Sequence, residues 1–113
     1  MTEERILDRV RLRAICRDDA ALMRDVLETL VAEADDLLGE LHVAVTTQDG
    51  SSASGPVAAL EGIARNVGAH ELRLVTHDVE AAIAENNWDA VRTGMESLER
   101  AVERLRRSAG ELD

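Results

Sequence analysis

Lysine, phenylalanine and tyrosine are absent from this chain of 113 residues, which has only one tryptophan, one proline and one cysteine. Without large aromatic side chains, the hydrophobic core must be built almost entirely from aliphatic residues. The scarcity of proline and the many alanine, leucine, glutamate and arginine residues favour helices over strands. The length predicts a single domain over residues 1–113.

The lone cysteine, Cys16, excludes an intramolecular disulfide and is typical of a reducing compartment. We expect it to be a small buried hydrophobic residue rather than a reactive thiol.

The N-terminal residues do not resemble a signal peptide, and no apolar run reaches the length of a membrane span. The net charge of −10 argues against binding to nucleic acid, which needs a basic surface. We therefore predict a cytoplasmic protein without nucleic-acid or membrane partners.

Hydrophobic spacing and helix-breaking residues predict five helices. The first covers about Glu3 to Cys16, with Ile6, Leu7, Val10 and Ala14 on one face and Leu12 and Ile15 off it. Asp18 or Asp19 caps a long second helix that reaches about Thr47. Its predicted buried stripe consists of Leu22, Val26, Leu30, Ala34, Leu37, Leu41 and Val45.

A glycine- and serine-rich segment from Asp49 to Gly55 is predicted to be a loop. Pro56 suits the first position of a short third helix over about Pro56 to Val67, with Gly68 as its C-terminal stop. The fourth helix covers about Ala69 to Glu85 and buries Leu72, Val75, Val79 and Ile83. After a tight turn at Asn86-Asn87, the fifth helix has a regular apolar seam made of Val91, Met95, Leu98, Val102, Leu105 and Ala109.

Short connections between successive helices imply antiparallel neighbours. The predicted fold is therefore all-α: an antiparallel up-down four-helix bundle with a short N-terminal helix covering one end.

The segment from Ala58 to Ala69 resembles the signature of the histidine-containing phosphotransfer (HPt) domain. That signature has a phosphorylatable histidine, a lysine three residues later, a glycine after the lysine, and a Gly-Ala pair further on. Gly62, Gly68 and Ala69 stand at the matching spacings. Ala58 stands at the histidine position and Glu61 at the lysine position. The resemblance covers about Asp19 to Leu105 and implies an HPt-like bundle that lacks its phosphoacceptor.

The helical period places the signature on one side of the third helix. At about 100° per residue, Val57, Leu60, Ala64 and Val67 fall on one face, which must be the core face. The opposite face carries Ala58, Glu61, Gly62 and Arg65, and Glu61 and Arg65 can form an i,i+4 ion pair. Because Glu61 would repel a phosphoryl group where a lysine would attract it, two requirements of phosphoryl transfer are lost. Because both Ala58 and Glu61 depart from the signature, natural loss of phosphotransfer is favoured over a single engineered substitution of the histidine.

Other chemistry receives little support from the residues. His70 and His77 share an outward face of the fourth helix, and their spacing of seven does not match the i,i+4 pair of helical zinc sites. His42 lies on the second helix beside core positions. We predict no metal, no cofactor and no catalytic residue.

The resemblance implies a partner class, because HPt domains dock response-regulator receiver domains or histidine kinases through the surface around this helix. The leading hypothesis is a monomeric, non-enzymatic two-component signalling protein that binds such a partner through Ala58, Glu61, Gly62 and Arg65, as adaptor or inhibitor. One alternative is an active phosphotransfer protein, seen as a mutant or using another histidine. Another is a structural or oligomerisation bundle.

Overall fold

The computed structural model describes residues 8–67 and 69–111. Within these ranges the chain forms only helices, and no strand occurs. The helices are α2 (Arg9–Ile15), α3 (Ala20–Thr46), α4 (Gly50–Val67), α5 (His70–Ala84) and α6 (Trp88–Gly110).

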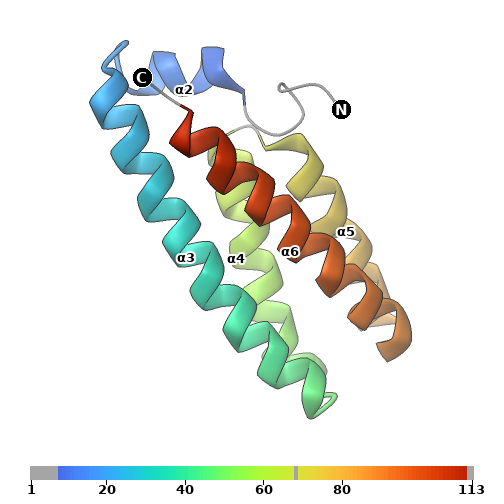
Figure 1. Ribbon diagram of the computed structural model, residues 1–113. Coiled ribbons are helices and arrows are strands. Elements are labelled where there is room, and N and C mark those ends of the chain that lie inside the picture. The colour runs from blue at the N-terminus through green and yellow to red at the C-terminus, as the bar shows by residue number, and fades with distance from the viewer. Residues whose placement is uncertain (1–7, 68, 112–113) are drawn as a thin grey trace.

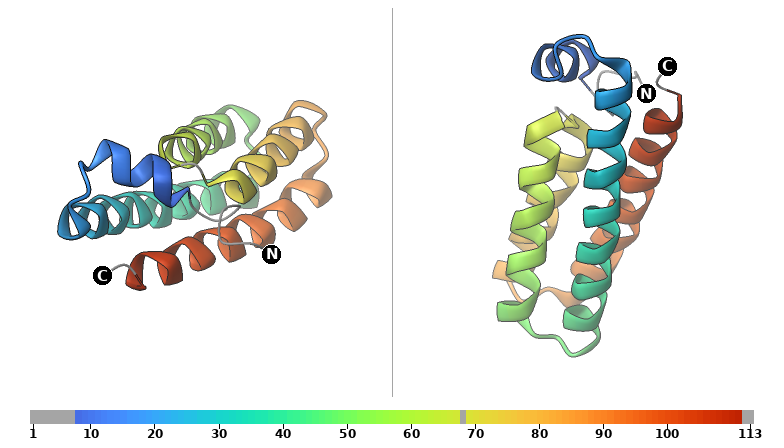
Figure 2. Two further views of the ribbon diagram at one scale, coloured as in Figure 1. Left: turned by 90° about the horizontal axis from the view of Figure 1, so that it is seen from above. Right: turned by 90° about the vertical axis from the view of Figure 1, so that its left-hand side faces the viewer.

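The four long helices form an antiparallel bundle (Figure 1). Each of them packs against its neighbour in the sequence, and α3 packs against α6 to close the ring. The short α2 lies across the end at which α3 begins and α6 ends, where it contacts α3 and α4 (Figure 2). The predicted four-helix bundle with a covering N-terminal helix is therefore confirmed.

The apolar face predicted for the first helix is wrong. Residues 3–7 lie outside the described residues, and α2 starts only at Arg9, with Asp8 as its N-cap. Val10 is 78% exposed and Ala14 is also exposed, whereas Leu12 and Cys16 are buried. Because α2 lies across the end of the bundle, it buries the residues that point at the end of the core. These are Leu12 and Cys16, which are four residues apart and share one face of the helix. The expectation of a buried Cys16 is confirmed.

The predicted stripe of α3 is correct at its C-terminal half and shifted by one residue at its N-terminal half. Leu22 is exposed, and the buried residues of that half are Met23, Leu27 and Val31. Val26, Leu30 and Leu37 are partly buried and still pack against the core. Because α3 contacts both α4 and α6, its buried arc is wider than a single stripe. The predicted cap is confirmed, since the Asp19 carboxylate accepts the amide hydrogen of Leu22 at 3.1 Å.

The loop predicted from Asp49 to Gly55 is wrong, because α4 begins at Gly50 and contains Pro56 in its interior. The connection from α3 is a short turn in which Gln48 has a positive φ of 52°. The Asp49 carboxylate accepts from both the amide and the hydroxyl of Ser52, at 3.2 and 2.7 Å. Ala53 is completely buried, so packing against the core overrides the low helix propensity of this segment.

The predictions for α5 and α6 agree with the structure. The turn at Asn86 has a φ of 58°, and the Asn87 side chain caps α6 by accepting from the Ala90 amide at 3.2 Å. Leu72 and Val79 of α5 are buried, and Val75 and Ile83 are partly buried against the core. All six predicted seam residues of α6 are buried: Val91, Met95, Leu98, Val102, Leu105 and Ala109. The C-terminal stop predicted at Gly68 lies outside the described residues.

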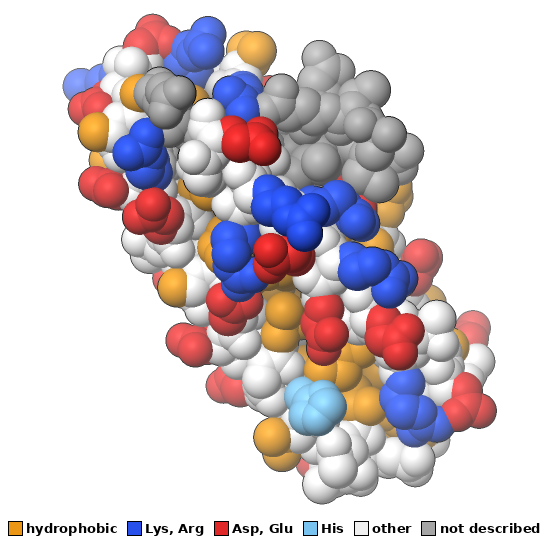
Figure 3. Space-filling view, in the orientation of Figure 1, with side chains coloured by type: hydrophobic (Ala, Val, Ile, Leu, Met, Phe, Trp, Pro, Cys, Tyr) orange, Lys and Arg blue, Asp and Glu red, His pale blue; other side chains and the backbone are white. Residues whose placement is uncertain are grey.

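Ion pairs between helices cover the outside of this aliphatic core. The Arg104 guanidinium of α6 bonds both carboxylate oxygens of Glu71 on α5, and Arg106 pairs with Asp35 of α3. Figure 3 shows that basic and acidic side chains are mixed over the α6 face of the molecule. Among the described residues, no helix is both long enough and apolar enough to cross a membrane.

Gly94 of α6 lets α5 and α6 approach closely. A Cβ atom built at this position would lie 2.5 Å from Cγ2 of Val79, which is itself buried. We expect Gly94→Ala to lower the free energy of unfolding by about 1–3 kcal/mol, because the added methyl group forces the two helices apart. Urea denaturation followed by far-UV circular dichroism measures this change.

Gly39→Ala is the matched control, since a Cβ atom at Gly39 would meet nothing within 4 Å. It should raise stability by up to about 1 kcal/mol, because alanine is the better helix former. Equal effects of the two substitutions would show that the α5–α6 contact does not depend on Gly94.

Candidate functional site

The outward face of α4 has the orientation that the helical period predicts. Val57, Leu60, Ala64 and Val67 are buried, with at most 1% of their surface exposed. On the other side, Ala58 and Arg65 are exposed, while Glu61 and Gly62 are half-buried. Of the last two, Glu61 contacts α5, because its carboxylate lies 3.6 Å from the Nε2 atom of His77.

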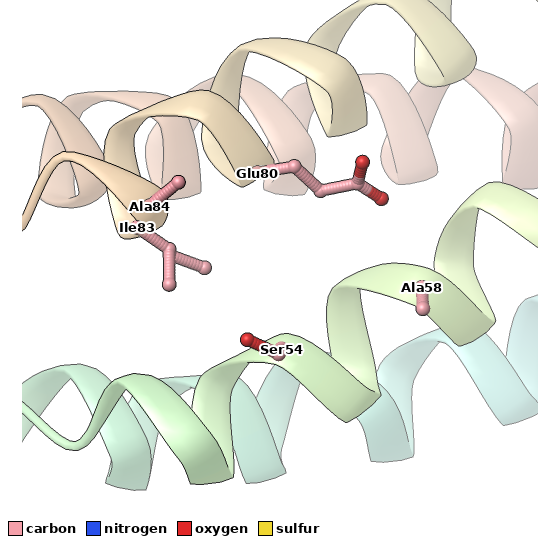
Figure 4. Close-up of a pocket in the computed structure, with 5 residues that line it drawn as sticks. All are labelled: Ser54, Ala58, Glu80, Ile83 and Ala84. Carbon is pink, nitrogen blue, oxygen red and sulfur yellow. The ribbon is translucent and has the colours of Figure 1, made fainter.

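An open groove of about 370 Å³ separates α4 from α5 beside Ala58. Ser54 and Ala58 line it from α4, and Glu80, Ile83 and Ala84 line it from α5 (Figure 4). The α4 wall is made of small side chains, so the groove is open on that side and leads directly to the position of Ala58.

Glu61 is the electrostatic centre of this surface. Its carboxylate accepts a hydrogen bond from the Arg65 guanidinium at 2.7 Å, which confirms the predicted i,i+4 pair. His77 of α5 places its Nε2 atom 3.6 Å from the same carboxylate oxygen. The hydrogen bond from Arg65, followed by one with Glu80, holds the pKa of Glu61 below its usual value.

Glu80 of α5 lies within hydrogen-bonding reach of Glu61 and has the opposite tendency. Partial burial, followed by its hydrogen bond to Glu61 and the repulsion between the two carboxylates, raises the pKa of Glu80. The surroundings of the two carboxyl groups therefore favour the ionised form of Glu61 and the neutral form of Glu80.

Gly62 plays no part in packing between the helices. A Cβ atom built there would meet nothing within 4 Å, in contrast to the crowded position of Gly94. A glycine within a helix costs about 1 kcal/mol relative to alanine, and nothing inside the bundle requires that cost here. The open space beside Gly62 therefore faces the outside of the molecule.

The sequence indicated the α4 residues of this surface but not those of α5. His70 and His77 are exposed, as predicted, and His42 is exposed as well. The contact of His77 with Glu61 and the position of Glu80 depend on how α4 and α5 are aligned, which no local pattern reveals. Over the described ranges, no group of three or more histidine, cysteine or acidic side chains is arranged to hold a metal ion.

Comparison with known protein families assigns this bundle to a family. The model of the Hpt domain family matches residues 25–108, which cover most of α3 and the whole of α4, α5 and α6. The chain belongs to the Hpt domain family. HPt domains are phosphotransfer carriers of two-component phosphorelays rather than classical enzymes, so the role of this protein lies in such signalling.

Solved structures of other HPt proteins have the same fold. The crystal structure of histidine-containing phosphotransfer protein B (HptB) from Pseudomonas aeruginosa PAO1 superposes with a TM-score of 0.83. The identity is 20%, over 93% of this chain and 91% of that chain. The HPT domain of a sensor hybrid histidine kinase from Shewanella gives a TM-score of 0.73 at 12% identity, over 98% and 99% of the two chains. No curated protein sequence matches the chain.

The Glu61–Glu80 pair predicts a pH-dependent effect of Glu80→Gln on stability. A carboxyl group whose pKa is raised by folding contributes stability at low pH and loses it as the pH rises through the folded value. Glutamine keeps a hydrogen-bond donor for Glu61 but cannot ionise. We therefore expect Glu80→Gln to become more favourable relative to wild type as the pH rises from about 4 to about 7. Parallel urea titrations across this range measure the difference.

Asp78→Asn removes the same charge from α5, where Asp78 lines a separate groove with residues of α6. Measured in the same titrations, it gives the effect of removing one negative charge from α5 outside the candidate site. If the difference in stability between Glu80→Gln and wild type is constant with pH, folding does not raise the pKa of Glu80.

Proposed function

We propose that this protein is a docking module of a two-component system that binds a response-regulator receiver domain, or a histidine kinase, without carrying phosphate at position 58. The surface formed by Ala58, Glu61, Gly62 and Arg65 is the docking site. By occupying a partner that other phosphotransfer proteins use, the protein acts as an adaptor or an inhibitor.

The observation that supports this proposal best is the exposed Ala58 beside an open groove on a fully folded HPt bundle. An alanine side chain has no atom that can accept a phosphoryl group. The helix that carries it is nevertheless packed so that this position remains accessible. The surface is accessible to a binding partner, but position 58 lacks a side chain that could accept a phosphoryl group.

The charge next to Ala58 also opposes phosphoryl transfer. Phosphoryl-transfer sites stabilise the transferred group with cationic side chains. Here Glu61 and Glu80 lie together, and the nearby Arg65 already bonds Glu61. A phosphoryl group at position 58 would therefore meet carboxylates rather than an available cation.

Phosphotransfer assays test the loss of activity directly. After incubation with a phosphorylated receiver domain, the wild-type protein should contain no acid-labile phosphohistidine. Stoichiometric label would contradict the proposal and favour an active protein. If the label disappeared in His77→Gln, the half-exposed His77 near Glu61 would be the acceptor.

Restoring activity should require changes at both positions of the signature. We expect Ala58→His alone to accept little phosphate and Ala58→His combined with Glu61→Lys to accept about 10²-fold more or better. The initial rate of label transfer measures the difference. Full transfer by the single Ala58→His variant would show that Glu61 is not an obstacle.

Docking through α4 is tested with Gly62→Arg. Because the space outside Gly62 is open, an arginine fits without disturbing the core, and helicity should be unchanged. Its side chain would cover the proposed docking site and weaken receiver binding at least about tenfold. Calorimetry with a receiver captured by the wild-type protein measures this loss.

Gly39→Arg is the matched control, because Gly39 is an equally open position on α3. It should leave binding unchanged. Equal affinities of the two variants would place the docking site elsewhere, and a pull-down that enriches no receiver or kinase would favour a structural bundle.

A further inference from the structure

A basic and apolar surface at one end of the bundle has no part in the site described above. We call it the α2 surface, and it consists of six exposed residues of α2 and the turn after it: Val10, Arg11, Arg13, Ala14, Ile15 and Arg17. Val10 and Ile15 expose 78% and 58% of their surface. They are two of the three most exposed large hydrophobic residues in the part of the chain that the structure describes.

The charge of the α2 surface is opposite to that of the whole protein. Residues 9–17 contain four arginines and no acidic residue, whereas the remainder of the chain has nine arginines against 23 acidic side chains. Arg13 pairs with Asp18 at 3.5 Å, while Arg11 and Arg17 have no ion-pair partner among the described residues. The α2 surface therefore attracts negatively charged groups that the rest of the protein repels.

The core, α4 and the following turn hold α2 in a fixed position. The opposite side of α2 is buried in the end of the core through Leu12. The amide of Asp8 donates a hydrogen bond to the carbonyl of Val67 at 3.2 Å, which joins the start of α2 to the end of α4. After the helix, Arg17 and Asp18 have φ values of 53° and 61°, a left-handed conformation that non-glycine residues rarely adopt in succession. The α2 surface is therefore organised before any partner binds.

The α2 surface is adjacent to the proposed docking site. Arg65 belongs to that site and to the last turn of α4, and α2 packs on α4 at the end where α4 finishes (Figure 2). The helix rises by only about 14 Å from Ala58 to Val67. A typical interface covers about 800 Å² on each protein, which corresponds to a patch about 30 Å across. A partner centred on Gly62 therefore reaches α2.

We propose that the α2 surface is a second contact for the receiver domain that docks on α4, and that this receiver presents an acidic edge with an apolar centre to it. The inference rests on the proposed function for the class of partner, and it adds the chemistry of the partner's surface. Arg11 and Arg17 pair with carboxylates of the receiver, while Val10 and Ile15 pack on its apolar centre. Because the remainder of this chain is acidic, the reversed orientation would bring like charges together. The α2 surface thus sets the orientation in which the receiver covers Ala58.

The experiment uses the full chain and a receiver domain that the wild-type protein captures. Association and dissociation rates are measured by surface plasmon resonance at about 50 mM and about 300 mM salt. The double variant Arg11→Glu/Arg17→Glu should lower the association rate at least about tenfold at the lower salt and make it less sensitive to salt. Ile15→Ser should leave the association rate unchanged and raise the dissociation rate about threefold or more, because it removes apolar contact without changing charge.

Arg92→Glu/Arg100→Glu is the matched control, because it reverses two exposed arginines of α6 outside both surfaces. It changes the net charge of the protein by the same amount as the α2 variant. Its effect on the association rate should be much smaller. Equal effects of the two double variants would show that net charge alone steers the receiver, and the inference would be overturned.

The inference and the proposed function fail in different ways. If Arg11→Glu/Arg17→Glu binds the receiver as fast as wild type, docking on α4 stands and the role of the α2 surface is overturned. In that case, wild-type dimers that the variant does not form would assign the surface to a second copy of this chain. Sedimentation of wild type alone with phosphatidylserine vesicles would assign it to a lipid surface. If no receiver is captured, the proposed function fails and the inference fails with it.

Discussion

The packing of α4 between α3 and α5 is the interaction on which the surface of this protein depends. Val57, Leu60 and Val67 are almost completely buried, and truncating a buried leucine typically costs about 2–5 kcal/mol. Turning α4 by one residue would expose part of this face and bury Ala58 in its place. The rotation of the helix is therefore fixed by the core. Accessibility at position 58 follows from aliphatic packing and does not require a histidine there.

This separation explains how the outward face of α4 can vary while the HPt bundle keeps its form. The residues that stabilise α4 and those that face outward belong to different sides of the helix. Substitutions on the outward side change charge and chemistry with little effect on the core. Ala58 and Glu61 are two such positions, and the ion pair between Glu61 and Arg65 is accommodated at the surface. The fold is a scaffold whose outward face can change its chemistry while the core stays the same.

The extent to which the sequence predicts the structure differs between helices for physical reasons. The α6 seam is fully predictable, because it alternates steps of four and three residues and all its members are buried. The α3 stripe is displaced at Met23 and Leu27, because a helix with two neighbours buries a wider arc than one row of side chains. For α2, the geometry of crossing the bundle end determines which side is buried, and no periodicity encodes that geometry.

The candidate site also contains residues that the sequence predicts and residues that it does not. Ala58, Glu61, Gly62 and Arg65 are close in sequence, and their shared face follows from the helical period. Glu80 is distant in the sequence and joins the site only because α4 and α5 are aligned in a particular way. A local pattern could indicate that α5 has an outward side but not which turn of α4 it meets. Contacts between helices are therefore the part of the site that the sequence does not reveal.

The first two turns of α4 have a consequence for motion. Residues 50–55 contain glycine and serine almost throughout, and Pro56 has no amide hydrogen to bond the carbonyl of Ser52. A segment with low helix propensity and a missing backbone bond opens locally more often than the remainder of its helix. Ser54, which forms part of the groove wall, belongs to this segment. The groove therefore opens more readily at Ser54 than a groove between two regular helices would.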